Sequence, residues 1–241
     1  MDTPALALIL GICFLGSFVQ AACGFGFAVV VMGVLSALMP SFGEAAGLSN
    51  LLMLCVSAAF MLRLRGHIRW KVILWPFLAY VPVSFVMVRI VAADPNGVMQ
   101  TLLGIGLIGL GIYMIFLQGR LHIRMTRAAG LVTGAVSGVL GGLFCMAGVP
   151  MSLYLLSMEE KEDYLATIQT FFAMVAVYST ALHGFSGFLT GTVLRAFLYS
   201  ILAVALGAVA GKLVFNRMNR DVLKKAVYGF MLVSGVLLIV L

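Results

Sequence analysis

Residues 20–27 read QAACGFGF, and residues 141–150 read GGLFCMAGVP. Each stretch interrupts a long apolar segment near its middle, the first within residues 5–39 and the second within residues 128–158. We call residues 23–26 the first break and residues 145–150 the second break. Paired interruptions at corresponding places in the two halves of a chain are typical of transporters with a binding site between the halves. The two breaks therefore predict where a substrate binds.

The composition predicts a multi-pass, all-α membrane protein. Of the 241 residues, 63% are hydrophobic and 10% are charged. Several apolar runs approach the ~20 residues that a helix needs to cross ~30 Å of hydrocarbon, and this excludes a soluble protein. Residues 1–4 lack the basic region of a secretory signal, so we expect the first apolar segment to be retained. We expect the protein in the plasma membrane, the bacterial inner membrane.

The net charge of +7 does not indicate a nucleic-acid partner. The Lys and Arg residues lie almost wholly in short loops between apolar spans, where they set orientation and meet anionic lipid. The expected partners are the lipid bilayer and a small anionic substrate. The cysteines lie inside apolar segments without CxxC spacing, so we expect no metal, no cofactor and no disulfide framework among Cys13, Cys23, Cys55 and Cys145.

Single spans are predicted at residues 44–62, 72–92, 97–118, 164–186, 193–213 and 222–241. Three short connections are rich in Lys and Arg, which indicates cytoplasmic loops, namely residues 63–71, 120–127 and 217–225. Two others carry no Lys or Arg and are predicted to face outward, namely residues 94–97 and 187–192.

This charge pattern favours a re-entrant hairpin at residues 128–158. A single crossing there would put the basic residues of 217–225 outside, against the positive-inside rule. A segment that enters, turns at the second break and returns keeps all three basic loops inside. The acidic run 159–163 would then also be cytoplasmic, and we expect it to be a solvated loop.

We predict the same kind of hairpin for residues 5–39 by analogy. They match residues 128–158 in length, in the interruption and in their position ahead of three spans. The chain then consists of two halves, residues 1–127 and residues 128–241, each a hairpin followed by three spans. The halves have opposite orientations within one membrane domain, which is an inverted-topology repeat.

Residues 20–27 resemble the first-half GFG signature of the TauE/SafE-type exporters of sulfite and organosulfonates. Residues 138–150 resemble the Gly-rich signature of the second half, which normally reads GGPP. The resemblance covers nearly the whole chain and implies a sulfite exporter or anion transporter without catalytic residues, for sulfite, thiosulfate or a sulfonate such as sulfoacetate. Ala147 and Val149 stand where Gly and Pro are expected, so the substrate stays open.

A hairpin that turns within hydrocarbon leaves N–H and C=O groups unpaired, so its turn must be buried in protein or line a wet cavity. Half-helix N-termini at two such turns offer N–H donors and partial positive charge, which suit an oxyanion. Glycines let the backbone approach the ligand. We predict substrate binding near the bilayer midplane, mainly by main-chain donors, at Cys23, Gly24, Phe25, Gly26, Asn50, Cys145, Ala147, Gly148 and Gln169.

The polar side chains near the breaks have more than one possible role. Asn50 and Gln169 lie about two turns into the spans that follow the hairpins, and they either contact the substrate or gate, or bond between helices. Cys23 and Cys145 either touch the anion or are small buried apolar residues. We expect freed backbone groups to be satisfied by two flanking side chains, Gln20 and Ser137.

Few charged side chains lie inside the spans. His183 is a candidate for gating or proton coupling, although its place near the outer end of its span favours an interfacial hydrogen bond. Arg89 is a candidate for gating or for recruiting anions at the outer mouth, and it can instead snorkel to the interface. Gly207 and Gly211 form a small-xxx-small pattern that fits either a homodimer contact or packing within the chain.

Two other classes of membrane protein share features with this sequence. Residues 134–138, GAVSG, with the later His183, resemble the GxSG nucleophile of rhomboid intramembrane serine proteases, but Ala135 occupies the position of the first Gly. Transmembrane thiol carriers of the CcdA/DsbD type also place one cysteine in each of two inverted repeats. Their cysteines normally neighbour prolines, which are absent beside Cys23 and distant from Cys145.

Overall fold

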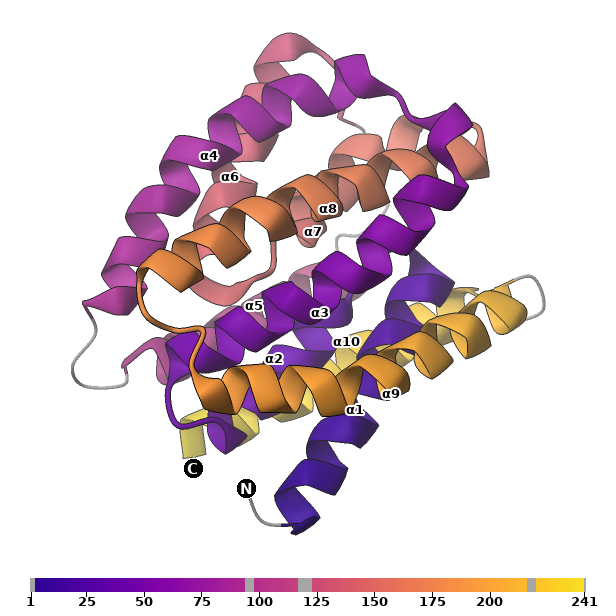
Figure 1. Ribbon diagram of the computed structural model, residues 1–241. Coiled ribbons are helices and arrows are strands. Elements are labelled where there is room, and N and C mark those ends of the chain that lie inside the picture. Colours follow the sequence, from indigo (N-terminus) through magenta and orange to yellow (C-terminus); the bar gives the residue numbers. More distant parts are fainter. Residues whose placement is uncertain (1–2, 94–97, 117–122, 216–219, 241) are drawn as a thin grey trace.

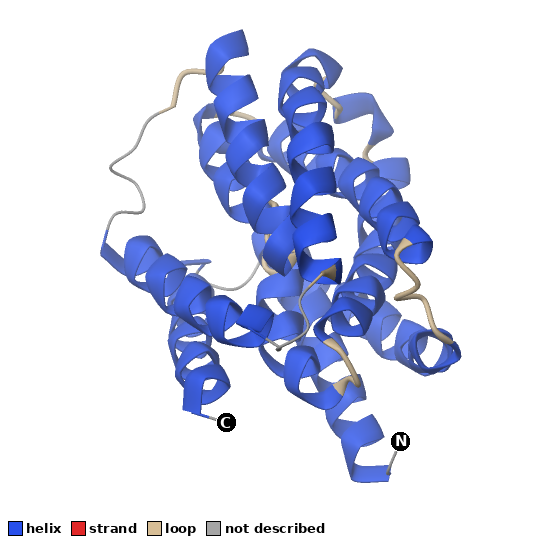
Figure 2. Cartoon of the chain, turned by 90° about the vertical axis from the view of Figure 1, so that its left-hand side faces the viewer, coloured by secondary structure: helices blue, strands red, loops and turns tan. Residues whose placement is uncertain are grey.

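The computed structural model describes residues 3–93, 98–116, 123–215 and 220–240, and within these ranges the chain is helical without strands (Figures 1 and 2). The helices of the first half are α1 (Thr3–Cys23), α2 (Phe27–Leu38), α3 (Phe42–Arg63), η1 (Arg65–His67), α4 (Trp70–Ala92) and α5 (Val98–Phe116). Those of the second half are α6 (Arg127–Phe144), α7 (Gly148–Tyr154), η2 (Leu155–Ser157), α8 (Lys161–Phe185), α9 (Gly191–Phe215) and α10 (Arg220–Val240).

Six helices are long and apolar enough to cross a membrane, which makes this a multi-pass membrane protein. Four coincide with predicted spans, and they are α3, α4, α8 and α9. The other two, Pro4–Cys23 and Arg127–Phe144, are the first arms of the predicted hairpins. The predicted spans 97–118 and 222–241 correspond to α5 and α10. The loop 94–97, Arg120 and Arg217 lie outside the described residues.

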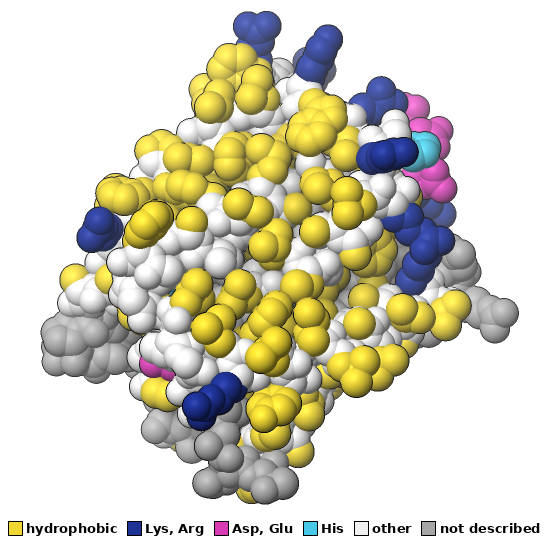
Figure 3. Space-filling model, viewed as in Figure 1, with side chains coloured by type: hydrophobic (Ala, Val, Ile, Leu, Met, Phe, Trp, Pro, Cys, Tyr) yellow, Lys and Arg dark blue, Asp and Glu magenta, His cyan; other side chains and the backbone are white. Residues whose placement is uncertain are grey.

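Large apolar side chains cover the outer surface of the helices. Along α9, one face carries Leu198 at 68%, Leu202 at 66% and Leu213 at 70% exposure. Figure 3 shows hydrophobic side chains spread over most of the visible face, while many of the Lys and Arg side chains gather along its right-hand edge. An apolar surface of this extent is unfavourable in water and matches the hydrocarbon of a bilayer.

Both apolar segments are interrupted where the sequence predicted. Helix α1 ends at Cys23 and α2 begins at Phe27, because Gly24 (φ +86°) and Gly26 (φ +110°) adopt left-handed conformations that end one helix and redirect the next. Helix α6 ends before Cys145 (φ 62°), the one non-glycine residue with positive φ in the described ranges. A left-handed cysteine is a strained backbone that the surrounding packing must hold.

Four helix pairs make the most extensive contacts, and each joins the two halves of the chain: α4 with α6, α1 with α9, α3 with α8, and α5 with α10. Small residues allow the close approach. A Cβ on Gly134 of α6 would collide with the backbone of Pro76 in α4. A Cβ on Gly207 or Gly211 of α9 would collide with carbonyl groups of α1. The small-xxx-small pattern of α9 is therefore used within the chain.

The acidic run 159–163 is only partly a solvated loop, which corrects the expectation for it. Asp163 is 7% exposed, and its carboxylate accepts from Arg69 Nε at 2.6 Å and lies 3.1 Å from His67 Nδ1. Glu162 lies 3.1 Å from His67 Nε2. These contacts place the start of α8 and the basic loop 63–71 at the same end of the molecule, where charged pairs remain near water.

A glycine-to-alanine pair tests the packing of α4 against α6. We expect Gly134→Ala to lower the thermal unfolding midpoint of the detergent-purified protein, because the new methyl group meets main-chain atoms of Pro76 that cannot rotate away. Gly109→Ala on α5, where a Cβ has no neighbour within 4 Å, is the control and should leave the midpoint unchanged or raised. Equal midpoints for the two variants would contradict this account.

Candidate functional site

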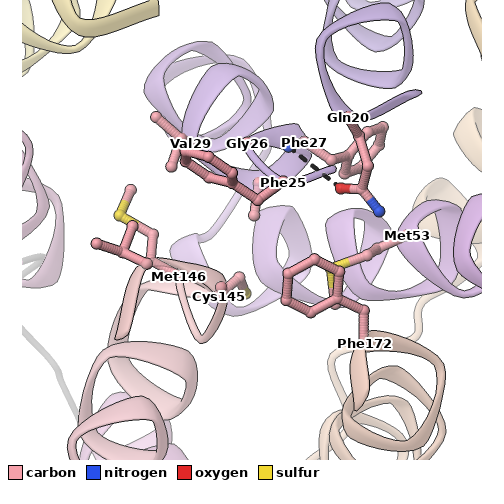
Figure 4. Close-up of a pocket in the computed structure, with 12 residues that line it drawn as sticks. Gln20, Phe25, Gly26, Phe27, Val29, Met53, Cys145, Met146 and Phe172 are labelled. Carbon is pink, nitrogen blue, oxygen red and sulfur yellow. Dashed lines mark hydrogen bonds between the residues drawn. The ribbon is translucent and has the colours of Figure 1, made fainter. Parts of the chain in front are cut away.

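A small cavity of about 20 Å³ lies between the two breaks (Figure 4). It is lined by Gln20, Phe25, Gly26, Phe27, Ala28, Val29, Met53, Cys145, Met146, Gly148, Val149 and Phe172. Met53 and Phe172 come from near the middle of α3 and α8, the two central helices that pack side by side. A volume of this size accommodates about one water molecule.

Gln20 holds the first break together from one side. Its Oε1 accepts a hydrogen bond from the N–H of Phe27, the first residue of α2, at 3.3 Å (Figure 4). Its Nε2 donates to Ser57 Oγ at 3.1 Å and to Gln169 Oε1 at 3.2 Å. The prediction that Gln20 satisfies a freed backbone group is confirmed, and it does so while linking α1, α3 and α8.

Two amides reach across the molecule to the breaks. Gln169 of α8, in the second half, donates through Nε2 to the carbonyl of Gly24 in the first break at 3.3 Å. Asn50 of α3, in the first half, donates through Nδ2 to Cys145 Sγ in the second break at 3.4 Å and to the carbonyl of Ala46 at 2.9 Å. Each break is thus fixed by an amide of the opposite half, as buried backbone and thiol groups require.

The structure separates the predicted binding residues into two groups. Phe25, Gly26, Cys145 and Gly148 line the cavity. The others lie in or against the breaks without lining it, and they are Cys23, Gly24, Asn50, Ala147 and Gln169. Asn50 and Gln169 have the interhelical hydrogen bonds that were one of their two predicted roles.

Sequence reasoning missed the apolar lining, above all Met53 and Phe172. Both stand three residues after the amides Asn50 and Gln169. Residues at i and i+3 lie on the same face of a helix, so that spacing was the signal that would have found them. Gly148 belongs to the same packing, because a Cβ there would lie 2.6 Å from Phe172 Cζ.

The cavity is neutral in its side chains, since none of its lining residues carries a charge. Its polar groups are the Gln20 amide, the Cys145 thiol and main-chain groups. The first turn of α2 begins with Phe27, Ala28 and Val29, and N–H groups in a first turn have no carbonyl partner within the helix. Phe27 is satisfied by Gln20. The positive end of the α2 dipole is therefore directed at this cavity.

The remaining polar candidates lie elsewhere. His183 Nδ1 lies 2.7 Å from the carbonyl of Ser179, and the ring is 1% exposed about 16 Å along α8 from Phe172. Arg89 is exposed and stacks 5.2 Å from the Phe85 ring. Their roles in gating or proton coupling stay predictions.

Ser137 does not serve as predicted. Its hydroxyl is buried, and among the described residues it bonds to no backbone group. His183 Nε2 likewise has no hydrogen-bond partner in the described part of the chain. The two side chains therefore form no serine–histidine pair of the kind that an intramembrane protease uses.

Comparisons with known proteins give one family and one curated relative. The family described as sulfite exporter TauE/SafE matches residues 8–238. A probable sulfite/organosulfonate exporter TauE from Cupriavidus necator is 26% identical over 162 residues, which are 65% of this chain and 63% of that protein. The chain thus spans less than two thirds of that relative's length. No solved structure matches the chain.

Substitutions at Gln20 test whether it stabilises the first break. Gln20→Leu leaves the Phe27 N–H without its acceptor and should destabilise the fold by about 1–3 kcal/mol. Ser57→Ala removes one of the two acceptors of Gln20 Nε2 and should cost less, about 0.5–1.5 kcal/mol. Thermal or denaturant unfolding in detergent measures both. A loss for Ser57→Ala as large as that for Gln20→Leu would refute the bond to Phe27 as the main contribution.

Proposed function

Because the chain belongs to the sulfite exporter TauE/SafE family, we propose that it moves a small sulfur-containing oxyanion outward across the bacterial inner membrane. The proposed substrate is sulfite, thiosulfate or a sulfonate such as sulfoacetate. The relative from Cupriavidus necator, named a probable sulfite/organosulfonate exporter, supports this class of substrate. Membership in a transporter family favours translocation without covalent chemistry.

The observation that carries the proposal is the single cavity shared by both breaks. We place the oxyanion there, against Gly26 and the first turn of α2 on one side and Cys145 and Gly148 on the other. An oxyanion accepts hydrogen bonds from main-chain N–H groups and is favoured by the positive end of a helix dipole. Because no lining side chain carries a charge, we assign recognition of the anion mainly to these main-chain groups.

At about 20 Å³ the cavity is too small for a sulfur oxyanion, so loading requires the two breaks to move apart. In the proposed cycle the two halves rock against each other, and the site opens to one face of the membrane at a time. Asn50 and Gln169 act as positioning residues, since each ties one break to the opposite half.

An inverted repeat is part of the proposal. Exchanging the halves converts the contact of α4 with α6 into that of α9 with α1, and it converts the bond from Asn50 to the second break into that from Gln169 to the first. The return of the second hairpin is supported by Tyr154, whose hydroxyl donates to the carbonyl of Thr126, just before α6, at 3.3 Å. A pseudo-two-fold axis in the membrane plane accounts for these paired contacts.

Cysteine labelling tests the proposed orientation. In a variant without native cysteines, we expect Gly191→Cys to react with a membrane-impermeant maleimide in intact spheroplasts. Gly66→Cys and Glu159→Cys should react only after permeabilisation. Both positions are exposed, and both lie at the end of the molecule that carries the basic loop 63–71, which we place in the cytoplasm. Labelling of Glu159→Cys from outside, with Gly66→Cys protected, would mean that residues 128–158 cross the membrane once.

Flux through purified protein in liposomes tests the function and its site together. Wild type should move sulfite or a sulfonate saturably, and Ala28→Leu should reduce this flux at least about tenfold, because Ala28 lines the cavity and the added carbons fill it. Ala37→Leu, on the exposed face of the same helix, is the matched control and should transport normally. Sulfite, thiosulfate, sulfoacetate, taurine and simple carboxylates form the substrate panel.

If none of these anions is moved or bound, the proposed function is wrong. Equal flux through Ala28→Leu and wild type would show that the substrate does not bind in this cavity. A double variant, Cys23→Ser with Cys145→Ser, separates the proposal from a thiol carrier. A carrier that uses main-chain donors should keep measurable flux, whereas thiol–disulfide exchange needs both sulfur atoms and would be lost.

A further inference from the structure

A second, larger cavity lies where the basic loop 63–71 begins. Its volume is about 280 Å³, and we call it the basic vestibule. It is lined by Ala21, Phe60, Arg63, Leu64, Lys161, Glu162, Leu165 and Lys212. These residues come from the end of α1, the end of α3, the start of α8 and the end of α9, which meet on the right-hand side in Figure 1.

The vestibule is positively charged. Arg63, Lys161 and Lys212 face a single acidic side chain, Glu162, which is itself paired with His67 at 3.1 Å. In the described part of the chain, none of the three cations forms an ion pair with a carboxylate. Like charges gathered in a concave, partly apolar site raise the local concentration of small anions.

Arg63 and Lys212 are the central pair of this surface. Both also line an adjoining cavity of about 170 Å³ between α3 and α9. They lie at the ends of helices from opposite halves of the chain. The start of α8 adds the positive end of its helix dipole to the same region, because Lys161 and Glu162 form its first turn.

The basic vestibule lies next to the first break. Ala21 lines the vestibule and its neighbour Gln20 lines the cavity between the breaks. Leu165, also in the vestibule wall, lies 3.5 Å from the Cβ position of Gly24, and Tyr164 lies 3.2 Å from it. The side chains of Tyr164 and Leu165 therefore form a layer between the charged vestibule and the first break.

We propose that the basic vestibule is the loading site from which a small divalent or monovalent oxyanion reaches the cavity between the breaks. It opens at the end of the molecule that carries the basic loop 63–71. This inference rests on the proposed function and assigns the direction from which the substrate is taken up. Arg63 and Lys212 attract the anion, and the Tyr164 and Leu165 layer separates it from the first break until the breaks part.

The test compares the two membrane faces. In everted vesicles, sulfite is presented to the face with the basic loop, and in right-side-out vesicles to the other face. The double variant Arg63→Gln with Lys212→Gln should raise the KM for sulfite about tenfold in everted vesicles, with little change in maximal rate. The KM in right-side-out vesicles should stay at the wild-type value. Arg65→Gln, in the same loop but outside the vestibule wall, is the control and should change neither value.

Three results would contradict the proposal that the vestibule is the loading site. These are an unchanged KM in the double variant, an equal effect of Arg65→Gln, or an equal rise in KM from both membrane faces. Liposomes with and without phosphatidylglycerol distinguish the free anion from a lipid headgroup. A rise in KM confined to phosphatidylglycerol liposomes would mean that the cations bind lipid headgroups, and this would also contradict the proposed loading site.

Failure of the proposed function has a different signature. If wild type moves no anion in the panel, binding of sulfate to the purified protein is measured by equilibrium dialysis. Binding that the double variant loses and Arg65→Gln keeps would support the vestibule while the transport proposal falls. Sulfate binding that is absent from wild type, or equal in all three proteins, would show that the vestibule is not an anion-binding site.

Discussion

The structure depends on one constraint: a helix that breaks among apolar helices must find partners for the backbone groups that the break releases. Gln20 accepts from the first N–H of α2, and Gln169 donates to the carbonyl of Gly24. Asn50 meets the second break at Cys145. Because the last two amides come from the opposite half, satisfying each break also fixes how the halves meet. The cavity lies where the two sets of bonds converge.

Close helix packing supports this arrangement from outside. The glycines of α6 let α4 approach, and the glycines of α9 let α1 approach, so α6 and α1 are each packed on a helix of the other half. Tyr80 of α4 bonds to Ser179 of α8 at 2.9 Å and so joins this packing to the central pair. Any motion that parts the breaks therefore has to change contacts between halves, because α1 and α6 make their most extensive contacts with helices of the opposite half.

Charge is arranged in two zones along the proposed path. The basic vestibule gathers cations where water and ions have access, and the cavity between the breaks has no charged side chain. A buried, unpaired side-chain charge is expensive in hydrocarbon, whereas helix-end N–H groups offer an anion partial charge without that cost. In the proposed path, side chains collect the anion and main-chain groups bind it.

The sequence by itself determined the membrane location, most of the spans, both breaks and the amides near them, because these follow from composition, glycine and span length, which are local properties. The resemblance of residues 20–27 and 138–150 to the sulfite exporters likewise needed no coordinates, and the family match agrees with it. Only the tertiary structure decided which partner each group takes. Gln169 bonds to the first break and Asn50 to the second. Asp163 is buried against Arg69, and Arg63 lies beside Lys212. Met53 and Phe172 lie in the cavity wall. These pairings join positions about a hundred or more residues apart, and packing between whole helices selects them, which no local pattern records.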